Sequence, residues 1–196
     1  MIVLASASAS RRAMLEGAGV DFAAHTASID EQAIKDAMAQ DGCPAAQVSE
    51  MLAELKALRV STLCPGIIVL GADQMLECEG QWFDKPESRD DAAAHLRFLR
   101  GKTHQLISSV VAVRDGHRLW HATDTARLTM RTFSDDFLTD YLDRCGDRLL
   151  STVGAYQLEG LGSQLFRYVQ GDYFTILGMP LLAVLDFLRE NGEIIP

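Results

Sequence analysis

The amino-acid sequence predicts a single α/β domain over residues 1–196, either one compact body or two small lobes that share a sheet. The chain opens with a short apolar strand, Ile2 to Ala5, a serine-rich loop and a helix from about Arg11 to Ala18. Further on, a helix-spaced segment, Ala45 to Leu63, precedes a fully apolar strand, Ile67 to Gly71. With 196 residues and 48% hydrophobic content, the chain can bury a core of its own.

The remaining elements are predicted from turn and capping signals. Gly80 suggests a turn in a small hairpin, Ser88 with two following aspartates predicts a helix start, and Asp115-Gly116 predicts the turn of a longer hairpin. The expected ranges are a strand at 21–28, a hairpin at 77–83, a helix at 88–100, strands at 104–114 and 118–129, a helix from 134, and a last helix at 180–189.

Composition excludes several kinds of partner. The formal net charge of −9 argues against a general nucleic-acid coat or an anionic membrane surface, since both select clustered Lys and Arg. No apolar run is long enough to span a bilayer, and the four cysteines form no C-x-x-C pair. We therefore expect a cytoplasmic protein with reduced cysteines, in which a polyphosphate ligand would need a local basic pocket and a metal.

The loop that follows the first strand is a candidate phosphate site. It contains the hydroxyls of Ser6 and Ser8 and the guanidiniums of Arg11 and Arg12, placed at a helix N-terminus. Backbone N–H groups at such an end favour an anion, and guanidinium binds phosphate oxygens in pairs. A solvated helix start capped by serine explains the same residues equally well.

Asp73 is the sharpest single candidate. It follows the apolar strand Ile67 to Gly71 at once, where ligands collect in α/β folds. A carboxylate there is expected to be partly buried and offset by a metal or a cation, and it could act as metal ligand or general base. A turn or helix-cap role is the alternative of similar weight.

Other charged residues matter only if the fold gathers them. Lys56 and Lys85 would be surface charges in most proteins, and Asp30-Glu31 is explained as well by a surface helix start as by a Mg²⁺ site. Neither a P-loop, nor a dinucleotide fingerprint, nor a nucleophile elbow occurs in the chain. What remains is a phosphate site of metal and lysine, without a covalent nucleophile.

Taken in order, these segments resemble the Maf family of nucleoside-triphosphate pyrophosphatases. The resemblance runs nearly end to end, although Ala9 replaces a proline of the family's opening motif. The matching segments are Leu4 to Leu15, Asp30-Glu31, Leu52 to Ala57, Gly71 to Gln74, Lys85-Pro86, Gly101 to His104, Gly154 to Gly162, Gly171 to Tyr173 and Leu177 to Leu181.

This resemblance implies a curved mixed β-sheet flanked by helices, two lobes around a central cleft, and often a homodimer. It implies Asp73 as the proton acceptor for the attacking water, with Glu31 and Asp73 near Mg²⁺, or Mn²⁺ in its place. Arg11, Lys56 and Lys85 would hold phosphates, Asp73, Lys56 and Lys85 being the catalytic set. Ser6, Ser8, Arg12, Gln74 and Glu159 complete the expected substrate-binding set.

Three positions bear on which nucleobase the substrate carries. Ser10, Gln74 and Glu159 resemble the 7-methyl-GTP enzymes of the family rather than the UTP/dTTP enzymes. A Glu can accept hydrogen bonds from a guanine edge and attract a cationic methylated ring. Ala155 and Tyr156 follow the UTP/dTTP group instead. The expected function is hydrolysis of 7-methyl-GTP or a similar modified purine triphosphate in house-cleaning of the nucleotide pool.

Three other functions stay open at this stage. They are a dTTP/UTP pyrophosphatase, a phosphatase that removes phosphate stepwise, and a non-catalytic nucleotide-binding regulator of cell division. The intact set of Asp73, Lys56 and Lys85 argues against the regulator, because binding alone does not require a carboxylate facing a polyanion.

Overall fold

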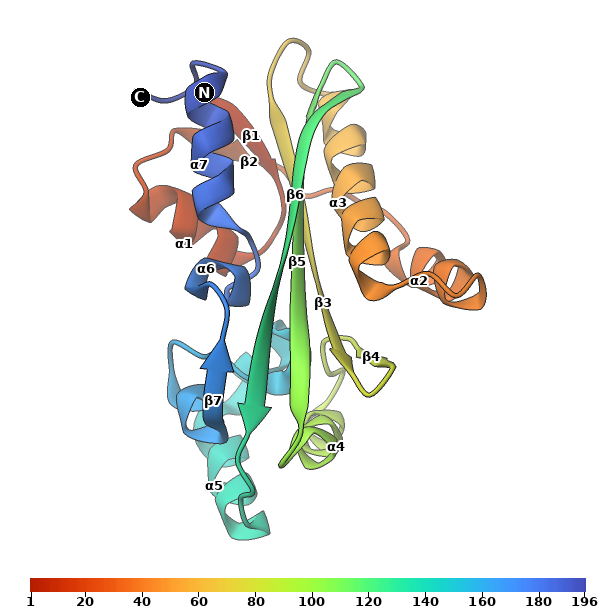
Figure 1. Ribbon diagram of the computed structural model, residues 1–196, viewed down its shortest axis with the longest axis vertical. Coiled ribbons are helices and arrows are strands. Elements are labelled where there is room, and N and C mark those ends of the chain that lie inside the picture. Colours follow the sequence, from red (N-terminus) through yellow and green to blue (C-terminus); the bar gives the residue numbers. More distant parts are fainter. The chain divides into compact units, whose positions relative to one another are not determined.

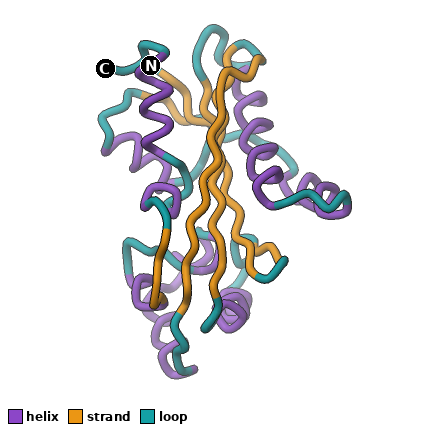
Figure 2. Tube along the Cα trace, viewed as in Figure 1, coloured by secondary structure: helices purple, strands orange, loops and turns teal.

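The computed structural model describes all 196 residues, which form two compact units. The first unit consists of residues 1–74, 107–124 and 172–196, and the second of residues 75–106 and 125–171. Three strands contribute residues to both units: β3 (Val69–Cys78), β5 (Thr103–Arg114) and β6 (His117–Met130). Figure 2 shows them as long orange traces.

Each unit has its own helices. The first unit contains β1 (Ile2–Ala5), α1 (Ala9–Gly17), β2 (Phe22–Ala24), α2 (Glu31–Gln40), α3 (Ala45–Ser61), α6 (Tyr173–Ile176) and α7 (Leu181–Glu190). The second contains β4 (Gln81–Phe83), α4 (Arg89–Leu99), α5 (Asp135–Cys145), β7 (Phe166–Gln170) and the 3₁₀ turns η1 (Gly146–Ser151), η2 (Val153–Ala155) and η3 (Leu161–Leu165). No helix is both long and apolar enough to cross a bilayer.

The strands form one mixed sheet, in the order β2-β1-β3-β5-β6-β7, with β4 paired to β3. β1 runs parallel to β2 and β3, whereas β4 and β7 are antiparallel to β3 and β6. The α/β class and the mixed sheet are therefore confirmed.

The first unit buries apolar side chains on both faces of the sheet. On one face, Val69 packs with Ala53, Ala57 and Val60 of α3. On the other, Leu70 and Ala72 pack with side chains of α1 and α7, which are Met14, Leu15, Leu181, Val184, Phe187 and Leu188. Figure 1 shows α3 on one side of the strands and α1 and α7 on the other. Successive residues of β3 therefore face opposite sides of the sheet, Val69 toward α3 and Leu70 toward α1 and α7.

Most predicted elements are confirmed, usually within two residues. Ser8, Ser88 and Ser134 are the N-caps of α1, α4 and α5, each accepting a hydrogen bond from a backbone N–H three residues on. The hairpin with its turn at Gly80 is also present. The expected strand at 21–28 is shorter, since only Phe22–Ala24 pair with β1.

One expectation about β3 is wrong. The sequence predicts that the strand ends at Gly71 and that Asp73 follows it, but β3 continues to Cys78. The strand is longer because its second half pairs with β4, where Leu76 lies opposite Phe83. The parallel neighbour β1 does end at Ala5, opposite Gly71. Asp73 therefore lies just beyond the parallel part of the sheet, although it is inside a strand.

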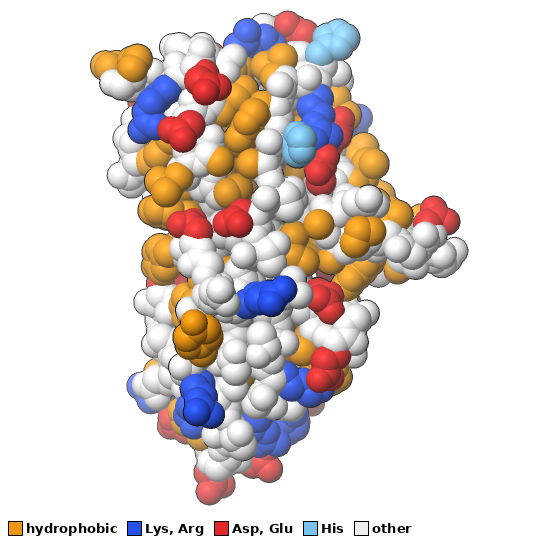
Figure 3. Space-filling view, viewed as in Figure 1, with side chains coloured by type: hydrophobic (Ala, Val, Ile, Leu, Met, Phe, Trp, Pro, Cys, Tyr) orange, Lys and Arg blue, Asp and Glu red, His pale blue; other side chains and the backbone are white.

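Charged side chains are mixed on the surface that Figure 3 draws. Lys and Arg side chains there are interspersed with Asp and Glu and do not join into one basic stripe. A nucleic-acid surface would show clustered positive charge. This face therefore gives no support for a nucleic-acid partner.

Candidate active site

The site in the first unit depends on a close approach of helix α3 to strand β3. A Cβ atom at Gly71 would lie 2.0 Å from the backbone oxygen of Ala53 and 2.7 Å from the backbone nitrogen of Ala57. Only glycine permits this distance, because any side chain would meet the helix backbone. The approach brings Lys56 of α3 beside Asp73, which lies on the same face of β3 as Gly71.

Lys56 joins the two predicted acidic residues. Its ammonium nitrogen lies 2.6 Å from Oδ1 of Asp73 and 2.9 Å from Oε1 of Glu31. Lys56 and Asp73 are buried, whereas the side chain of Glu31 is 43% exposed. Glu31 is the first residue of α2, whose N-cap is Asp30. The helix start expected at Asp30-Glu31 is therefore present, with Asp30 as its cap, while Glu31 faces the lysine and its role at a Mg²⁺ site stays a prediction.

The second carboxylate oxygen of Asp73 has no partner. Oδ2 is buried and makes no hydrogen bond, an arrangement that costs free energy unless a ligand or a proton completes it. Mg²⁺ is usually held by one or two carboxylates together with substrate phosphates and water. Asp73 with its unpaired oxygen and half-exposed Glu31 fit that donor set. No group of three or more His, Cys, Asp or Glu side chains is placed to hold a metal ion.

Arg11 is buried in the same unit and is held by neutral oxygens. Its Nε donates to the backbone oxygen of Gly178 at 2.8 Å, and one terminal nitrogen donates to that of Ala72 at 2.8 Å and to Oγ of Ser6 at 3.2 Å. Burial lowers the pKa of the guanidinium, while the charges of Asp73 and Glu31 oppose that shift. Arginine remains protonated even so. The guanidinium is thus a fixed positive charge that no contacting oxygen neutralises.

The serine loop has a structural role of its own. Ser8 caps α1, and Ser6 accepts from the backbone N–H of Ser8 at 3.2 Å as well as from Arg11. Arg12 is exposed. The structure therefore gathers Ser6, Ser8 and Arg11 but turns Arg12 to the surface. The contribution of these residues to phosphate binding stays a prediction.

Gln74 lies on the sheet face opposite Asp73. Its amide nitrogen donates to Oγ of Ser108 at 3.0 Å and to the backbone oxygens of Thr175 and Ile176, each at 3.1 Å. The amide nitrogen is thereby engaged within the protein, and only the amide oxygen is left to meet a substrate. Substrate binding by Gln74 stays a prediction.

Lys85 and Glu159 belong to the second unit, and both are exposed. Glu159 lies in a tight turn, in which the N–H of Gly160 donates to the oxygen of Gln157 at 3.2 Å. A Cβ at Gly162 would be 2.4 Å from that same oxygen, so the turn requires glycine there. Their expected roles, phosphate binding by Lys85 and base recognition by Glu159, stay predictions.

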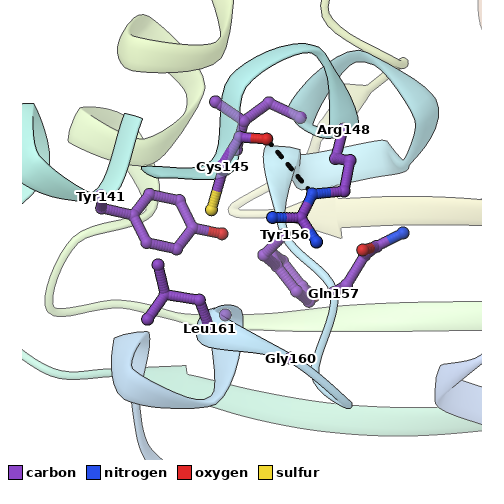
Figure 4. Close-up of a pocket in the computed structure, with 9 residues that line it drawn as sticks. Tyr141, Cys145, Arg148, Tyr156, Gln157, Gly160 and Leu161 are labelled. Carbon is purple, nitrogen blue, oxygen red and sulfur yellow. Dashed lines mark hydrogen bonds between the residues drawn. The ribbon is translucent and has the colours of Figure 1, made fainter. Parts of the chain in front are cut away.

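A small pocket lies beside this turn (Figure 4). It measures about 320 Å³ including the part open to solvent, and Tyr141, Tyr156 and Gly160 are among the residues that line it. Arg148 at its edge donates to the backbone oxygen of Cys145 at 3.4 Å. Neither Asp73 nor Lys56 lines it.

Two features of the site were missed at the sequence level. The carbonyl groups of Ala72 and Gly178 anchor Arg11, but a backbone oxygen has no signature in the sequence. Ser49 of α3 is fully buried and donates to the backbone oxygen of Asp73 at 3.3 Å. A serine on the apolar face of a helix could have drawn attention to it.

A mixed sheet with a buried lysine–aspartate pair, a second carboxylate and a buried arginine defines a class of α/β protein with a cluster of charged groups at its sheet. Comparison with known sequences identifies the family to which the chain belongs. The family model described as Maf-like protein matches residues 1–191, and the chain therefore belongs to the Maf family.

Several relatives cover almost the whole chain. A protein of Paramagnetospirillum magneticum named nucleoside triphosphate pyrophosphatase is 59% identical over 99% of this chain and 100% of its own length. One of the same name from Granulibacter bethesdensis is 50% identical over 97% of this chain and 96% of its own. A protein of Rhizobium etli named 7-methyl-GTP pyrophosphatase is 48% identical, covering 98% of this chain and 97% of its own.

Proposed function

We propose that this protein is a nucleoside-triphosphate pyrophosphatase, which hydrolyses an NTP to the monophosphate and pyrophosphate. The observation that carries the proposal is the buried Lys56–Asp73 pair, in which one oxygen of Asp73 has no partner. Membership of the Maf family and the names of its relatives support the same reaction. The matched family region also supports treating residues 1–191 as parts of one pyrophosphatase domain.

Asp73 is assigned the proton transfer. A water oxygen attacks the α-phosphorus, the bond from that phosphorus to the bridging oxygen breaks, and the water proton passes to the carboxylate of Asp73. Lys56 holds Oδ1 at 2.6 Å and so fixes the orientation of this carboxylate. Ser49 donates to the backbone oxygen of Asp73 and supports its position.

Charge on the leaving pyrophosphate needs cations. Arg11 is prepared for this task because its position is set by backbone oxygens, and Lys56 and Lys85 complete the proposed phosphate-binding set with Ser6, Ser8 and Arg12. Glu31 and Asp73 would hold Mg²⁺ or Mn²⁺. The ion, when bound, neutralises phosphate charge and polarises the phosphoryl oxygens.

We propose a methylated guanine nucleotide, such as 7-methyl-GTP, as the substrate. Glu159 supports it, because an exposed carboxylate can accept from a guanine edge and attract a cationic ring. Ala155 and Tyr156 resemble the UTP/dTTP group, but the ring of Tyr156 is buried and its hydroxyl contacts His104, so the contact with the base is assigned to Glu159. The name of the Rhizobium etli relative agrees with the same base.

The test is release of pyrophosphate with Mg²⁺ from a panel of UTP, dTTP, CTP, GTP and 7-methyl-GTP, with orthophosphate measured in parallel. We expect pyrophosphate as the first product and 7-methyl-GTP as the preferred substrate. Preference for UTP or dTTP would keep the reaction and reject the base. Stepwise release of orthophosphate, or saturable binding without turnover, would reject the pyrophosphatase.

The cysteines bear on where in the cell the protein would act. All four cysteines are free, which suits a reducing cytoplasm, where removal of non-standard nucleotides would take place. Family resemblance supports a homodimer, and light scattering on the purified protein at two concentrations tests it.

A further inference from the structure

A buried hydrogen bond in the second unit joins two residues to which the proposed reaction assigns no role. Nε2 of His104, at the start of β5, lies 2.6 Å from the hydroxyl of Tyr156, 52 residues away. His104 is 1% exposed and Tyr156 is 5% exposed. Both residues belong to the second unit.

The pair sits in an apolar setting. Phe166 packs against both rings, with centroids 5.9 Å from His104 and 4.8 Å from Tyr156. Nδ1 of His104 is buried without a partner. A buried polar atom left unpaired is unfavourable, and its retention calls for an explanation. The sequence carries a polar pair where an apolar pair would fill the same space at lower cost.

Tyr156 is also where a strained piece of backbone ends. Gly154 and Ala155 have φ of +76° and +59°, the second being unusual for a residue with a Cβ. Two further hydroxyls hold this backbone, because Tyr141 donates to the oxygen of Ala155 at 3.1 Å and Thr152 donates to that of Tyr156 at 2.9 Å. Three hydrogen bonds, from Tyr141, Thr152 and the His104–Tyr156 pair, therefore hold the chain immediately before the turn that carries Glu159.

The turn is held at both of its ends. Glu159 and Gly160 are exposed, Gln157 contacts the two glycines, and Ser163 of η3 donates to the oxygen of Gly160 from its N–H at 3.1 Å and from its hydroxyl at 2.8 Å. Tyr156, Gln157 and residues 160–162 line one pocket (Figure 4). On the side that precedes the turn, its direction is set by where Tyr156 fixes the chain.

We infer that His104 and Tyr156 are positioning residues for base recognition: their hydrogen bond sets the direction of the turn 157–162 and thereby the position of Glu159. The inference rests on the proposed function, since it takes Glu159 as the group that contacts the base. Both rings are buried, and no contact with the substrate is assigned to either of them. Loss of the bond should loosen the turn and reduce discrimination between bases, while the Lys56–Asp73 pair and the turnover of saturated enzyme stay as they are.

The experiment compares Tyr156→Phe with Tyr168→Phe. Both changes delete one phenolic oxygen in the second unit, but Tyr168 is 62% exposed. Two readouts are taken on each folded variant: kcat and KM for 7-methyl-GTP, GTP and UTP, and deuterium exchange of the backbone amides of residues 157–162.

We expect Tyr156→Phe to raise KM for the preferred nucleotide several-fold, to bring the kcat/KM values of the three nucleotides closer together, to leave kcat within about twofold, and to speed exchange in the turn. Tyr168→Phe should change none of these. A variant that only loses thermal stability, with selectivity and exchange like the control, would reject the inference in favour of a purely structural pair.

The two proposals fail in different ways. If the wild-type protein shows no turnover of any nucleotide, the proposed function fails, and unchanged exchange in Tyr156→Phe separately rejects the link between the pair and the turn. If turnover is present and prefers UTP, only the base is wrong, and the effect of Tyr156→Phe on selectivity still decides the inference.

Discussion

At the scale of single residues, the site combines groups that would be unremarkable alone. Lys56 and Asp73 are 17 residues apart and meet at 2.6 Å because α3 and β3 approach so closely. A buried ion pair is a weak source of stability, since desolvation of both charges offsets their attraction. Its presence beside an unpaired carboxylate oxygen and a third charge, Glu31, is better explained by chemistry than by stability.

The first prediction concerns the proton acceptor. Asp73→Asn keeps the size of the side chain and an oxygen for Lys56 but cannot accept a proton, so kcat should fall by about 10²-fold or more. Far-ultraviolet circular dichroism and the melting temperature should show a folded protein. Asp21→Asn, on an exposed residue of the same unit, serves as control. Wild-type turnover in folded Asp73→Asn would remove Asp73 from the mechanism.

A second prediction concerns base selectivity. Glu159→Gln replaces two acceptor oxygens by one acceptor and one donor, which suits a guanine edge less well. A hydrogen bond to a charged group contributes about 1.5 to 3 kcal/mol, so kcat/KM for 7-methyl-GTP relative to UTP should fall about tenfold or more. Glu87→Gln, also exposed in the second unit, should leave the ratio unchanged. An unmoved ratio in Glu159→Gln contradicts the role.

At the scale of secondary-structure elements, two contacts build the site. One is the packing of α3 on β3, and the other is the turn after α6, whose Gly178 oxygen accepts from Arg11. That turn is itself tied to β3, because Gln74 donates to the backbone oxygens of Thr175 and Ile176. Arg11, near the N-terminus, is thus positioned by strand β3 and by the turn after α6.

The third prediction tests the first of these contacts. Gly71→Ala places a Cβ against the backbone of α3, which cannot rotate away as a side chain can, and should cost about 3 kcal/mol of unfolding free energy. The displaced helix should also carry Lys56 away from Asp73 and lower kcat. Urea unfolding and kinetics well below the melting temperature measure the two effects.

Gly17→Ala is the matched control for this change. Gly17 is helical and has nothing within 4 Å of its ideal Cβ, so stability should be unchanged or raised by about 0.5 to 1 kcal/mol. If Gly71→Ala were as stable and as active as this control, close packing of α3 on β3 would not be what builds the site.

At the scale of the whole molecule, each unit buries an ionisable side chain that would be better solvated in water. The first unit buries Arg11, and the second buries His104, whose burial lowers its pKa to about 4. Arg11 stays protonated, whereas His104 makes the stability of the folded protein depend on pH, because the unfolded chain returns the ring to water.

The fourth prediction is an acid-dependent loss of stability through His104. In the unfolded chain this histidine takes up a proton near its ordinary pKa of 6.5, whereas the folded protein resists until about pH 4. The contribution is therefore complete above pH 6.5 and is lost as pH falls toward 4. At 1.36 kcal/mol per pKa unit, the loss amounts to about 3 kcal/mol.

His104→Gln isolates this contribution, because glutamine does not titrate. The difference in unfolding free energy between wild type and variant should be largest above pH 6.5 and should shrink by about 3 kcal/mol by pH 4, measured by urea unfolding. Equal pH profiles for the two proteins would mean that His104 is not held neutral by burial.

Much of the fold was predictable from the sequence, because local signals and the fold agree. Serine caps, the turn at Gly80 and apolar runs placed most helices and strands within two residues. The misses have identifiable causes. The start of α2 at Asp30-Glu31 was one of two alternatives, but its extent and the strand β7 were not predicted, because α2 buries none of its residues and four of the five residues of β7 are exposed, so neither shows a clear apolar period. The true end of β3 depends on pairing with β4, which no local pattern in β3 reveals.

By itself, the sequence determined the α/β class, the family and the identity of the charged residues, since these depend on residue types and their order. Only the tertiary structure decided that Lys56 bridges Asp73 and Glu31, that Arg11 is held by carbonyl oxygens, and that Gln74 lies on the sheet face opposite Asp73. The physical reason is distance. A contact between residues 17 to 167 positions apart depends on how helices pack on the sheet, and backbone oxygens are the same in every residue.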